Sequence, residues 1–329
     1  MFYHSESVYN MSKSKREEHT IIGIDGGGTH TRGVLFREGK IQAKVKSGTT
    51  RIGTVGVGES CERTLNVIIE LCNQAGIETS ELDAVIVGLA GVWLDEEKKR
   101  SAQLLKTLAR GQYVTLNDLL VTSDAEIALQ GALEGEEGMI TIVGTGSIGL
   151  GRTKEGLERC GGWGIELDDE GSGAWIGREG LTAVVRALDG RGKFTAMVDV
   201  IEDLYPTISI KEPRTIVKAY AERAFEYQML TPLVMKCAVE GDAVCLDIIQ
   251  RSARHLAELP EALLKYYPKT KKVKVALMGG IIDADTLLAR LLKEEIKKNK
   301  RLTAIEPKGT ALDGAISIGH KLIEEMQDD

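Results

Sequence analysis

The spacing of apolar residues predicts strands where the patterned part of the chain begins. Residues 20–25, TIIGID, form an apolar run that predicts a buried strand, and the glycine turn GGG follows it. The segments THTRGVLF and IQAKVK predict a second and a third strand, with a turn at REGK between them. This order is typical of a meander of three antiparallel strands.

Helices and strands alternate after this meander. Apolar residues recur at helical spacing over residues 57–75, and Gly76 ends the predicted helix. Residues 84–91 form a short apolar run that is typical of a buried parallel strand. A helix over residues 95–110, a strand over residues 119–124 and a helix over AEIALQGAL complete a βββαβαβα order.

A similar order begins again after residue 134. GMITIV predicts a strand, GTGS a tight turn, and IGLGRTKEGLERCGG two further strands. The turn KEG at Lys154–Gly156 repeats the turn REG at Arg37–Gly39, and this internal echo indicates a duplicated domain. Helical stretches, a strand over residues 274–280, a helix over 285–298 and a final helix from about residue 310 follow.

The size and composition favour two domains. The chain has 329 residues, of which 43% are hydrophobic, and this is enough for two buried cores. We expect an N-terminal extension over residues 1–19, a first domain over 20–133 and a second domain over 134–329. The fold class is then α/β, with two βββαβαβα domains and a cleft between them.

Composition also bears on partners and location. With 42 basic and 49 acidic side chains the formal net charge is −7, which argues against a nucleic-acid partner. No apolar run approaches the roughly 20 residues of a membrane helix, and the N-terminus lacks the apolar region of a signal peptide. Five cysteines without a close CxxC pair favour reduced thiols, so we expect a cytoplasmic protein without a membrane partner. We also expect a homodimer.

Two glycine-rich turns are candidates for phosphate binding. DGGGTHT at Asp25–Thr31 and GTGS at Gly144–Ser147 each follow a predicted strand. Glycines let the backbone approach an anion and direct N–H groups toward it, and hydroxyls of Thr29, Thr145 and Ser147 add donors. A single turn of this kind is more often only a hairpin turn. Two equivalent turns in two repeated halves favour a clamp on one polyphosphate.

Two other nucleotide motifs fit less well. Gly144, Gly146 and Gly149 satisfy GxGxxG, and Glu166 lies near the distance of a ribose-binding acid. That dinucleotide motif requires a helix after the turn, whereas strand and turn are predicted here. The Walker motif is absent, because no lysine follows the glycines at the first turn.

Carboxylates at strand ends suit phosphoryl transfer, which needs positioning, neutralisation of charge and a base for the acceptor proton. Asp25 precedes the first glycine turn and is a candidate for holding Mg²⁺ through water. Asp124 ends a strand and opens a helix, so it is either a helix N-cap, with Ser123 as a rival cap, or a catalytic group.

A third group of carboxylates lies in a glycine-rich stretch. The sequence DDEG places Asp168, Asp169 and Glu170 together, a few residues after Trp163 and its flanking glycines. Such a cluster is often only a solvated loop. An aromatic residue beside clustered acids also suits a polyol, which offers apolar faces and hydroxyl donors.

Six segments together resemble the BadF/BadG-type ATPases, a family that includes N-acetylglucosamine kinase and belongs to the superfamily of sugar kinases and actin. The resemblance runs from about Thr20 to the C-terminal helix, and its long segment from Gly161 is the most specific. The segments, in order, are IGIDGGGTHTRGVLF, VTSDAEIALQGAL, IVGTGSIGLGR, GGWGIELDDEGSGAWIGREGL, ALDGRG and VALMGGI.

The resemblance implies two actin-like (ribonuclease H-like) domains that close on ATP and a sugar, with the last helix, about residues 310–329, packing back on the first domain. It implies that Asp124 is the catalytic base of an ATP-dependent sugar kinase. The sugar-binding loop matches Gly162, Trp163, Gly164 and Asp169. The ATP-binding positions are Gly27, Gly28, Thr29, Gly144, Thr145 and Gly146 at the phosphates and Gly279 and Gly280 near the adenosine.

The sequence departs from the family pattern at two positions of the expected sugar site. Arg51 stands where the family carries an asparagine that contacts the sugar, and Asp168 replaces a glycine before Asp169. We therefore expect Arg51 and Asp168 to contact the sugar as well; the alternative is that they pair with each other or face solvent. N-acetylglucosamine, glucosamine or another hexose is then the expected substrate.

Two other functions remain open within this resemblance. Some family members are ATPases that activate acyl-CoA dehydratases or reductases through a shared iron–sulfur cluster with two cysteines per subunit. Here only Cys160 lies between Cys72 and Cys237, so that pair is missing. A sensor that binds sugar and nucleotide without catalysis is the other alternative, and Asp124 argues for catalysis.

Overall fold

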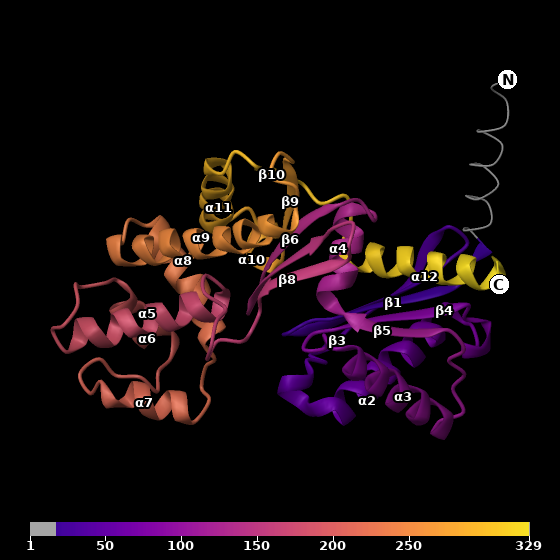
Figure 1. The fold of residues 1–329 in the computed structure, drawn as a ribbon. Helices are drawn as coiled ribbons and strands as arrows, with labels where there is room; N and C mark the ends of the chain where they lie inside the picture. The colour runs from indigo at the N-terminus through magenta and orange to yellow at the C-terminus, as the bar shows by residue number, and fades with distance from the viewer. Residues whose placement is uncertain (1–17, 329) are drawn as a thin grey trace. The chain divides into compact units, whose positions relative to one another are not determined.

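The computed structural model describes residues 18–328, which divide into two compact units. The first unit contains the described residues up to Glu136 together with those from Pro307 onward, and the second unit is Glu137–Glu306. Each unit is an α/β structure built on one five-stranded sheet (Figure 1).

The first unit follows the predicted order βββαβαβα. Its sheet has the order β3-β2-β1-β4-β5, antiparallel over β1–β3 and parallel over β1, β4 and β5. Its elements are β1 Ile21–Gly26, β2 His30–Arg37, β3 Lys40–Gly48, α2 Ile52–Ala75, η1 Thr79–Glu81, β4 Ala84–Leu89, α3 Asp95–Gly111, β5 Leu119–Ser123, α4 Asp124–Leu133 and α12 Ala311–Asp328.

Helices cover both faces of this first sheet. Side chains of α2 and α3, such as Leu65 and Leu105, join Ile22 and Ile24 of β1 in one buried cluster. On the opposite face, Ile316 and Ile323 of α12 pack against Ile21. Residues from both faces of β1 are therefore buried, which explains why this strand is apolar without alternation.

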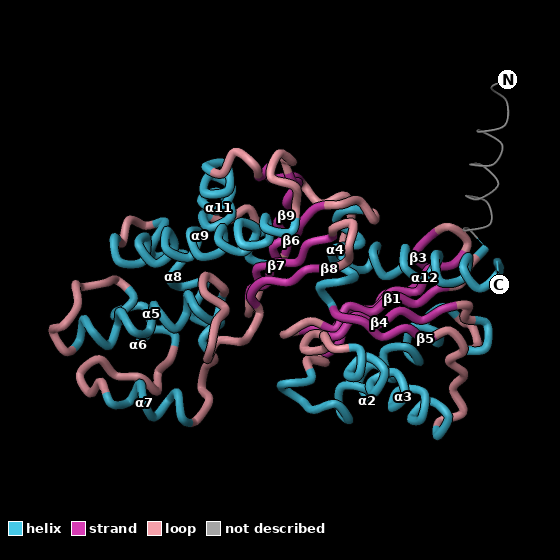
Figure 2. The backbone as a smooth tube through the Cα atoms, viewed as in Figure 1, coloured by secondary structure: helices cyan, strands magenta, loops and turns pink. Residues whose placement is uncertain are grey.

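The second unit repeats the sheet topology. Its strands have the order β10-β9-β6-β7-β8, which places a three-stranded meander beside two parallel strands, as in the first unit (Figure 2). The elements are β6 Gly138–Val143, β7 Ser147–Arg152, β8 Leu157–Gly161, α5 Gly173–Leu188, α6 Met197–Leu204, α7 Arg214–Ala221, η2 Tyr227–Leu230, α8 Thr231–Val239, α9 Ala243–Leu263, η3 Leu264–Tyr266, β9 Val273–Met278, α10 Gly280–Asp283, α11 Leu287–Lys298 and β10 Leu302–Ile305.

The structure differs from the expected elements in three places. Helix α2 begins at Ile52 rather than at Val57. The apolar spacing did not reveal its first residues, because the non-helical Gly56, with φ 80°, kinks the helix near its start and interrupts that spacing. The four-residue elements α10 and β10 were not predicted, since each is too short to show a period. The predicted duplication of the βββαβαβα order is confirmed by the equivalent sheets.

Within residues 18–328, no helix combines the length and the apolar character that a bilayer crossing needs. The expected extension over residues 1–19 lies almost entirely outside the described part of the chain.

Candidate active site

The first glycine turn is held in place by the segment that follows β3. Gly27, Gly28 and Thr29 form the link between β1 and β2, and the Gly27 N–H donates to the His30 carbonyl at 3.1 Å. The Thr49 hydroxyl donates to the Gly27 carbonyl at 3.0 Å. A second contact joins the hydroxyls of Thr31 and Thr50, also at 3.0 Å and buried. The turn and residues 49–51 therefore form one connected structure.

Arg51 is carried by this connected structure, directly before α2. Its N–H donates to the Thr49 hydroxyl at 3.0 Å, and Arg63 donates to the Thr49 carbonyl at 2.8 Å. The Arg51 side chain is half-buried. Its positive charge is one of the influences that lower the pKa of Asp124, so the structure brings Arg51 into the neighbourhood of the predicted base.

Asp25 and Asp124 lie at the carboxyl ends of two strands of the same sheet. Asp25, in β1, is 8% exposed and pairs in register with Gly88 of β4, which in turn pairs with Thr122 of β5. Asp124 follows two residues after Thr122, as the first residue of α4. The carboxyl ends of parallel strands lie at the same edge of a sheet, so both carboxylates lie at that edge. Strand β4, with Gly88 in register, lies between β1 and β5.

The structure shows which residue caps α4. Ser123 is the N-cap, since its hydroxyl accepts from the Glu126 N–H at 3.1 Å and the Glu126 carboxylate accepts from the Ser123 N–H at 3.3 Å. The Asp124 carboxylate accepts the adjacent Ala125 N–H at 2.9 Å. Ser123 therefore caps the helix, and the carboxylate of Asp124 is not required as the cap.

The surroundings of Asp124 raise its pKa to about 7. Burial is the largest cause, because it disfavours the charged form, and the negative charge of Asp25 adds to it. The Ala125 N–H and the charge of Arg51 act in the opposite direction. A carboxylate with a pKa near neutrality is suited to general-base catalysis.

Two residues that sequence reasoning did not single out shape this edge. A Cβ atom on Gly88 would lie 2.5 Å from Cδ1 of Ile127 and 3.1 Å from Cα of Asp124, so α4 approaches β4 as closely as it does only because residue 88 is glycine. Arg32 donates from Nη2 to Oδ2 of Asp25 at 2.6 Å. A glycine within the apolar run of residues 84–91 was the sequence signal that could have identified Gly88. The sequence contained no signal that could have identified Arg32.

The second glycine turn sits at the start of a helix. Gly144 donates to the Gly146 carbonyl at 2.9 Å and closes the turn between β6 and β7. The N–H groups of Gly173 and Ala174, at the start of α5, donate to the carbonyls of Gly144 and Thr145 at 2.9 and 3.0 Å. The turn is therefore fixed to the N-terminus of α5, where the helix dipole favours an anion.

Gly279 lies against the same part of the second unit. Its φ is 107°, and a Cβ atom there would stand 2.4 Å from the carbonyl oxygen of Val143, the residue before the turn. Gly280 has open space where a side chain would project. A cavity of about 390 Å³ lies just beyond α10, lined in part by Met235, Leu287 and Arg290.

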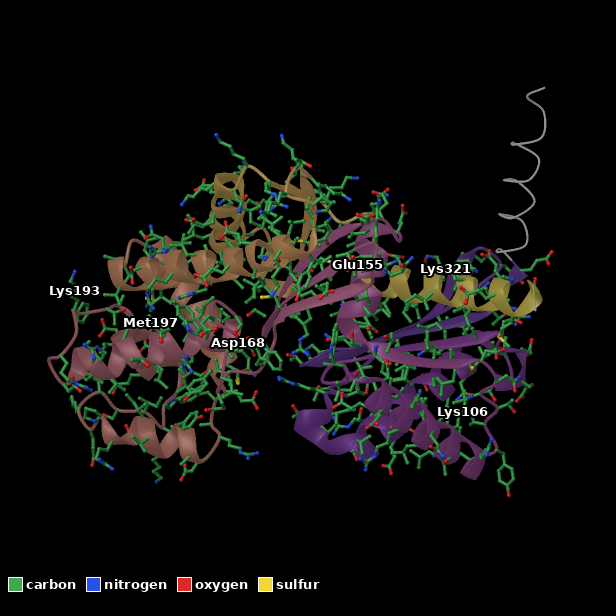
Figure 3. The ribbon with its side chains drawn as sticks, viewed as in Figure 1. Lys106, Glu155, Asp168, Lys193, Met197 and Lys321 are labelled. Atoms are coloured by element: carbon green, nitrogen blue, oxygen red, sulfur yellow. The ribbon has the colours of Figure 1, made fainter. Side chains whose placement is uncertain are left out.

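The predicted sugar-binding loop connects β8 to α5. Gly162 and Gly164 have φ values of 75° and 93°, which only glycine adopts easily, and Trp163 between them is 68% exposed. The Arg159 guanidinium lies 4.9 Å from the Trp163 ring centroid and donates to the Gly162 carbonyl. The Asp168 carboxylate accepts the Trp163 N–H at 3.1 Å and so closes the loop. Asp168 is labelled in Figure 3.

The Asp169 carboxylate contacts the second glycine turn. Unlike the exposed Trp163, it is only 5% exposed, and its Oδ1 accepts the Ser147 N–H at 3.3 Å. The structure therefore brings Asp169 to the glycine turn. It brings Gly162, Trp163, Gly164 and Asp168 together in the loop.

Four of the five cysteines are buried, and Cys160 is half-buried. Cys61, Cys72, Cys237 and Cys245 are buried, and burial raises the pKa of Cys61 and Cys72 to about 11. A protonated thiol is a poor ligand. Among residues 18–328, no three His, Cys, Asp or Glu side chains gather into a metal-binding group.

Comparison with known proteins identifies the family. The model of the BadF/BadG/BcrA/BcrD ATPase family matches residues 22–319. The chain belongs to this family. The resemblance predicted from the sequence motifs is thereby confirmed.

Proteins similar to this chain include kinases of amino sugars. N-acetylmuramic acid/N-acetylglucosamine kinase of Clostridium acetobutylicum is 31% identical over 303 residues, which cover 91% of this chain and 97% of the relative. Glucosamine kinase GspK of Vibrio cholerae is 27% identical, with 91% and 95% covered. The crystal structure of a Chromobacterium violaceum protein, described as a candidate N-acetylglucosamine kinase, has a TM-score of 0.72 at 26% identity, with 93% and 99% covered. The predicted actin-like, sugar-kinase fold class is confirmed by this similarity.

Proposed function

We propose that this chain is an ATP-dependent kinase that transfers a phosphoryl group to a hydroxyl of an amino sugar or related hexose. One observation carries the proposal. In a chain similar to amino-sugar kinases over nearly its whole length, Asp124 begins α4 directly after β5, with a pKa of about 7 and with Asp25 and Arg51 nearby. A base of this kind is what the acceptor hydroxyl of a sugar needs in phosphoryl transfer.

The proposed roles follow from what each group offers. Asp124 accepts the proton of the attacking sugar hydroxyl on its carboxylate. Arg51, half-buried beside it, offers guanidinium donors to neighbouring hydroxyls or to a carboxylate on the sugar. In the second unit, the loop of Gly162, Trp163, Gly164 and Asp168 offers an exposed indole face for an apolar face of the sugar ring. We propose Asp169 as part of this sugar site through its position in the loop.

We propose that both glycine turns bind the phosphates of ATP, with Gly27, Gly28 and Thr29 in the first unit and Gly144, Thr145 and Gly146 in the second. The turn of the second unit is supported by the N-terminus of α5, which favours negative charge. We place the adenosine near Gly279 and Gly280, since open space and a cavity adjoin α10.

Mg²⁺ is proposed to accompany ATP. Magnesium typically binds one or two carboxylates together with substrate phosphates, and Asp25 beside the first glycine turn fits such a donor set. One of its oxygens is paired with Arg32, so Asp25 would hold the ion through the other oxygen or through water. When bound, the ion neutralises charge on the phosphates.

The proposal includes a homodimer in the cytoplasm. Five free cysteines within the described residues suit a reducing compartment. Light scattering on the purified protein tests the dimer, and a monomeric mass would exclude it.

Coupled ADP release tests the function. The purified chain is incubated with Mg-ATP and a panel of N-acetylglucosamine, glucosamine, N-acetylmuramic acid, glucose and N-acetylmannosamine. We expect ADP release to depend on at least one amino sugar and a sugar phosphate to accumulate in equal amount. ADP release that is indifferent to every sugar would overturn the proposal.

A further inference from the structure

Two neighbouring aspartates of the loop between β8 and α5 have different partners. The Asp168 carboxylate accepts the Trp163 N–H and stays within the loop. Asp169 has a left-handed backbone, with φ 61°, and its Oδ1 accepts the Ser147 N–H in the turn between β6 and β7. The two adjacent carboxylates therefore bond to different segments of the chain.

The contact between Asp169 and the turn is close and specific. A Cβ atom on Gly146 would stand only 2.7 Å from Oδ2 of Asp169, so the carboxylate fills the place where residue 146 would otherwise carry a side chain. A second bond runs alongside, from the Ser147 hydroxyl to the Glu170 carbonyl at 3.3 Å. The loop is thus hydrogen-bonded to the turn through both residues 169 and 170.

The backbone leaves Asp169 little freedom. Its carbonyl accepts the Ser172 N–H at 3.0 Å, and Ser172 caps α5 by accepting the Trp175 N–H at 3.2 Å. The next residues, Gly173 and Ala174, donate to Gly144 and Thr145 of the same turn. Asp169 therefore connects the N-cap of α5 to the turn, and we call this connection through Asp169 the brace.

We propose that Asp169 is a positioning residue that holds the phosphate-binding turn Gly144–Ser147 in shape and couples it to the sugar-binding loop. The proposal rests on the proposed kinase function for the roles of the loop and the turn. Every contact that carries it lies within the second unit. Because one continuous segment contains Trp163 at one end and Asp169 at the other, a shift of the loop on sugar binding is transmitted to the turn.

Binding of Mg-ATP in the absence of sugar tests the brace directly. Asp169→Gly keeps a residue that tolerates the left-handed backbone but removes the carboxylate. We expect titration calorimetry to show Mg-ATP binding weaker by about tenfold or more, as the loss of a hydrogen bond to a charged group gives. Asp169→Asn retains an acceptor oxygen and should restore most of the affinity.

The neighbouring aspartate supplies a matched control. Asp168→Ala removes a carboxylate that contacts only its own loop among the hydrogen bonds described above, so Mg-ATP affinity should stay at the wild-type value while the KM for sugar rises. Unchanged or tighter Mg-ATP binding by Asp169→Gly would overturn the proposal. Tighter binding would mean that the carboxylate competes with phosphate for the Ser147 N–H.

A double-mutant cycle with Gly146→Ala provides a second test. The added methyl group collides with Asp169, so we expect this variant to weaken Mg-ATP binding and to raise the KM for sugar. Removing the Asp169 carboxylate relieves the collision, and the two effects should depart from additivity by at least about threefold. Additive effects would contradict the coupling. If Asp169→Gly fails to fold by circular dichroism, Asp169→Ala, which also removes the carboxylate, enters the same cycle.

The two proposals fail in different ways. If no sugar is phosphorylated, the calorimetric measurement of Mg-ATP binding still decides whether Asp169 supports the turn. If Mg-ATP binding is indifferent to Asp169 while sugar-dependent ADP release persists, the kinase function stands and the brace is wrong.

Discussion

At the scale of single residues, the chemistry of Asp124 comes from its neighbours. The tripeptide Ser123-Asp124-Ala125 is equally suited to a cap and to a catalytic group. Ser123 forms the capping box with Glu126, and burial together with Asp25 raises the pKa of Asp124 to about 7. The raised pKa thus belongs to a carboxylate that is not needed as the helix cap.

Asp124→Asn should reduce phosphoryl transfer by about 10²–10⁴-fold, because an amide cannot accept the proton of the sugar hydroxyl. Mg-ATP binding should survive. Coupled ADP release and calorimetry measure the two quantities, and turnover near the wild-type rate would exclude Asp124 as the base.

The same pKa predicts the pH dependence. The base must be ionised, so kcat/KM should fall about tenfold for each pH unit below the pKa of about 7 and level off above it. Because Arg51 lowers this pKa, Arg51→Asn should move the inflection to higher pH. An inflection that stays in place would show that Arg51 and Asp124 do not interact during catalysis.

We expect single residues to influence substrate choice as well. Arg51 and Asp168 stand at the two departures from the family pattern, so Arg51→Asn and Asp168→Gly should each change the ranking of sugars in the ADP-release panel. A positive guanidinium favours acidic sugars, so Arg51→Asn should lower kcat/KM for N-acetylmuramic acid more than for N-acetylglucosamine. An unchanged ranking in both variants would show that neither residue selects the substrate.

At the scale of elements, glycines allow helices to cross without side chains between them. Helices α4 and α12 approach so closely that a Cβ atom on Gly131 would lie 1.9 Å from the Thr310 carbonyl oxygen, and one on Gly314 would lie 1.9 Å from that of Ile127. This crossing secures the C-terminal helix to the helix that begins with Asp124. Its two glycines are far apart in the sequence, and no local pattern reveals that they meet.

Gly131→Ala and Gly314→Ala should each destabilise the protein by about 1–3 kcal/mol or more, as overpacking of a tight contact does. Gly58→Ala is the matched control, since nothing lies within 4 Å of its added Cβ atom in α2. That control should be neutral or stabilise by up to about 1 kcal/mol. Urea denaturation measures all three, and equal stability for Gly314→Ala and Gly58→Ala would disprove the close crossing.

At the scale of the whole molecule, the second unit is continuous in sequence, whereas the first unit needs both ends of the chain. Helix α12 covers a face of the first sheet that includes Ile21 and Ala84. The Lys308 N–H donates to the Ala132 carbonyl at 3.1 Å, so the two segments of the first unit meet. The expected domain limits at 133 and 134, with the last helix on the first domain, remain our proposal for the folding units.

A fragment of residues 137–306 should fold alone with a cooperative thermal transition. A fragment of residues 18–136 should not, because the face that α12 covers would be exposed to water. Joining residues 307–328 to residue 136 through a short Gly/Ser linker should restore folding. Cooperative folding of residues 18–136 without α12 would contradict this division.

The sequence by itself determined the fold class, the repeated βββαβαβα order and the two glycine turns. These depend on local features: apolar runs, periods of 3.6 and 2, and glycine where the backbone turns sharply. The tertiary structure decided what depends on residues far apart in the chain. It showed that Ser123 caps α4, that Arg32 pairs with Asp25, that Gly88 allows α4 to approach β4 closely, and that Asp169 contacts the second glycine turn. A pKa, a close crossing and the direction of a carboxylate are set by three-dimensional neighbours, and a linear pattern carries no record of them.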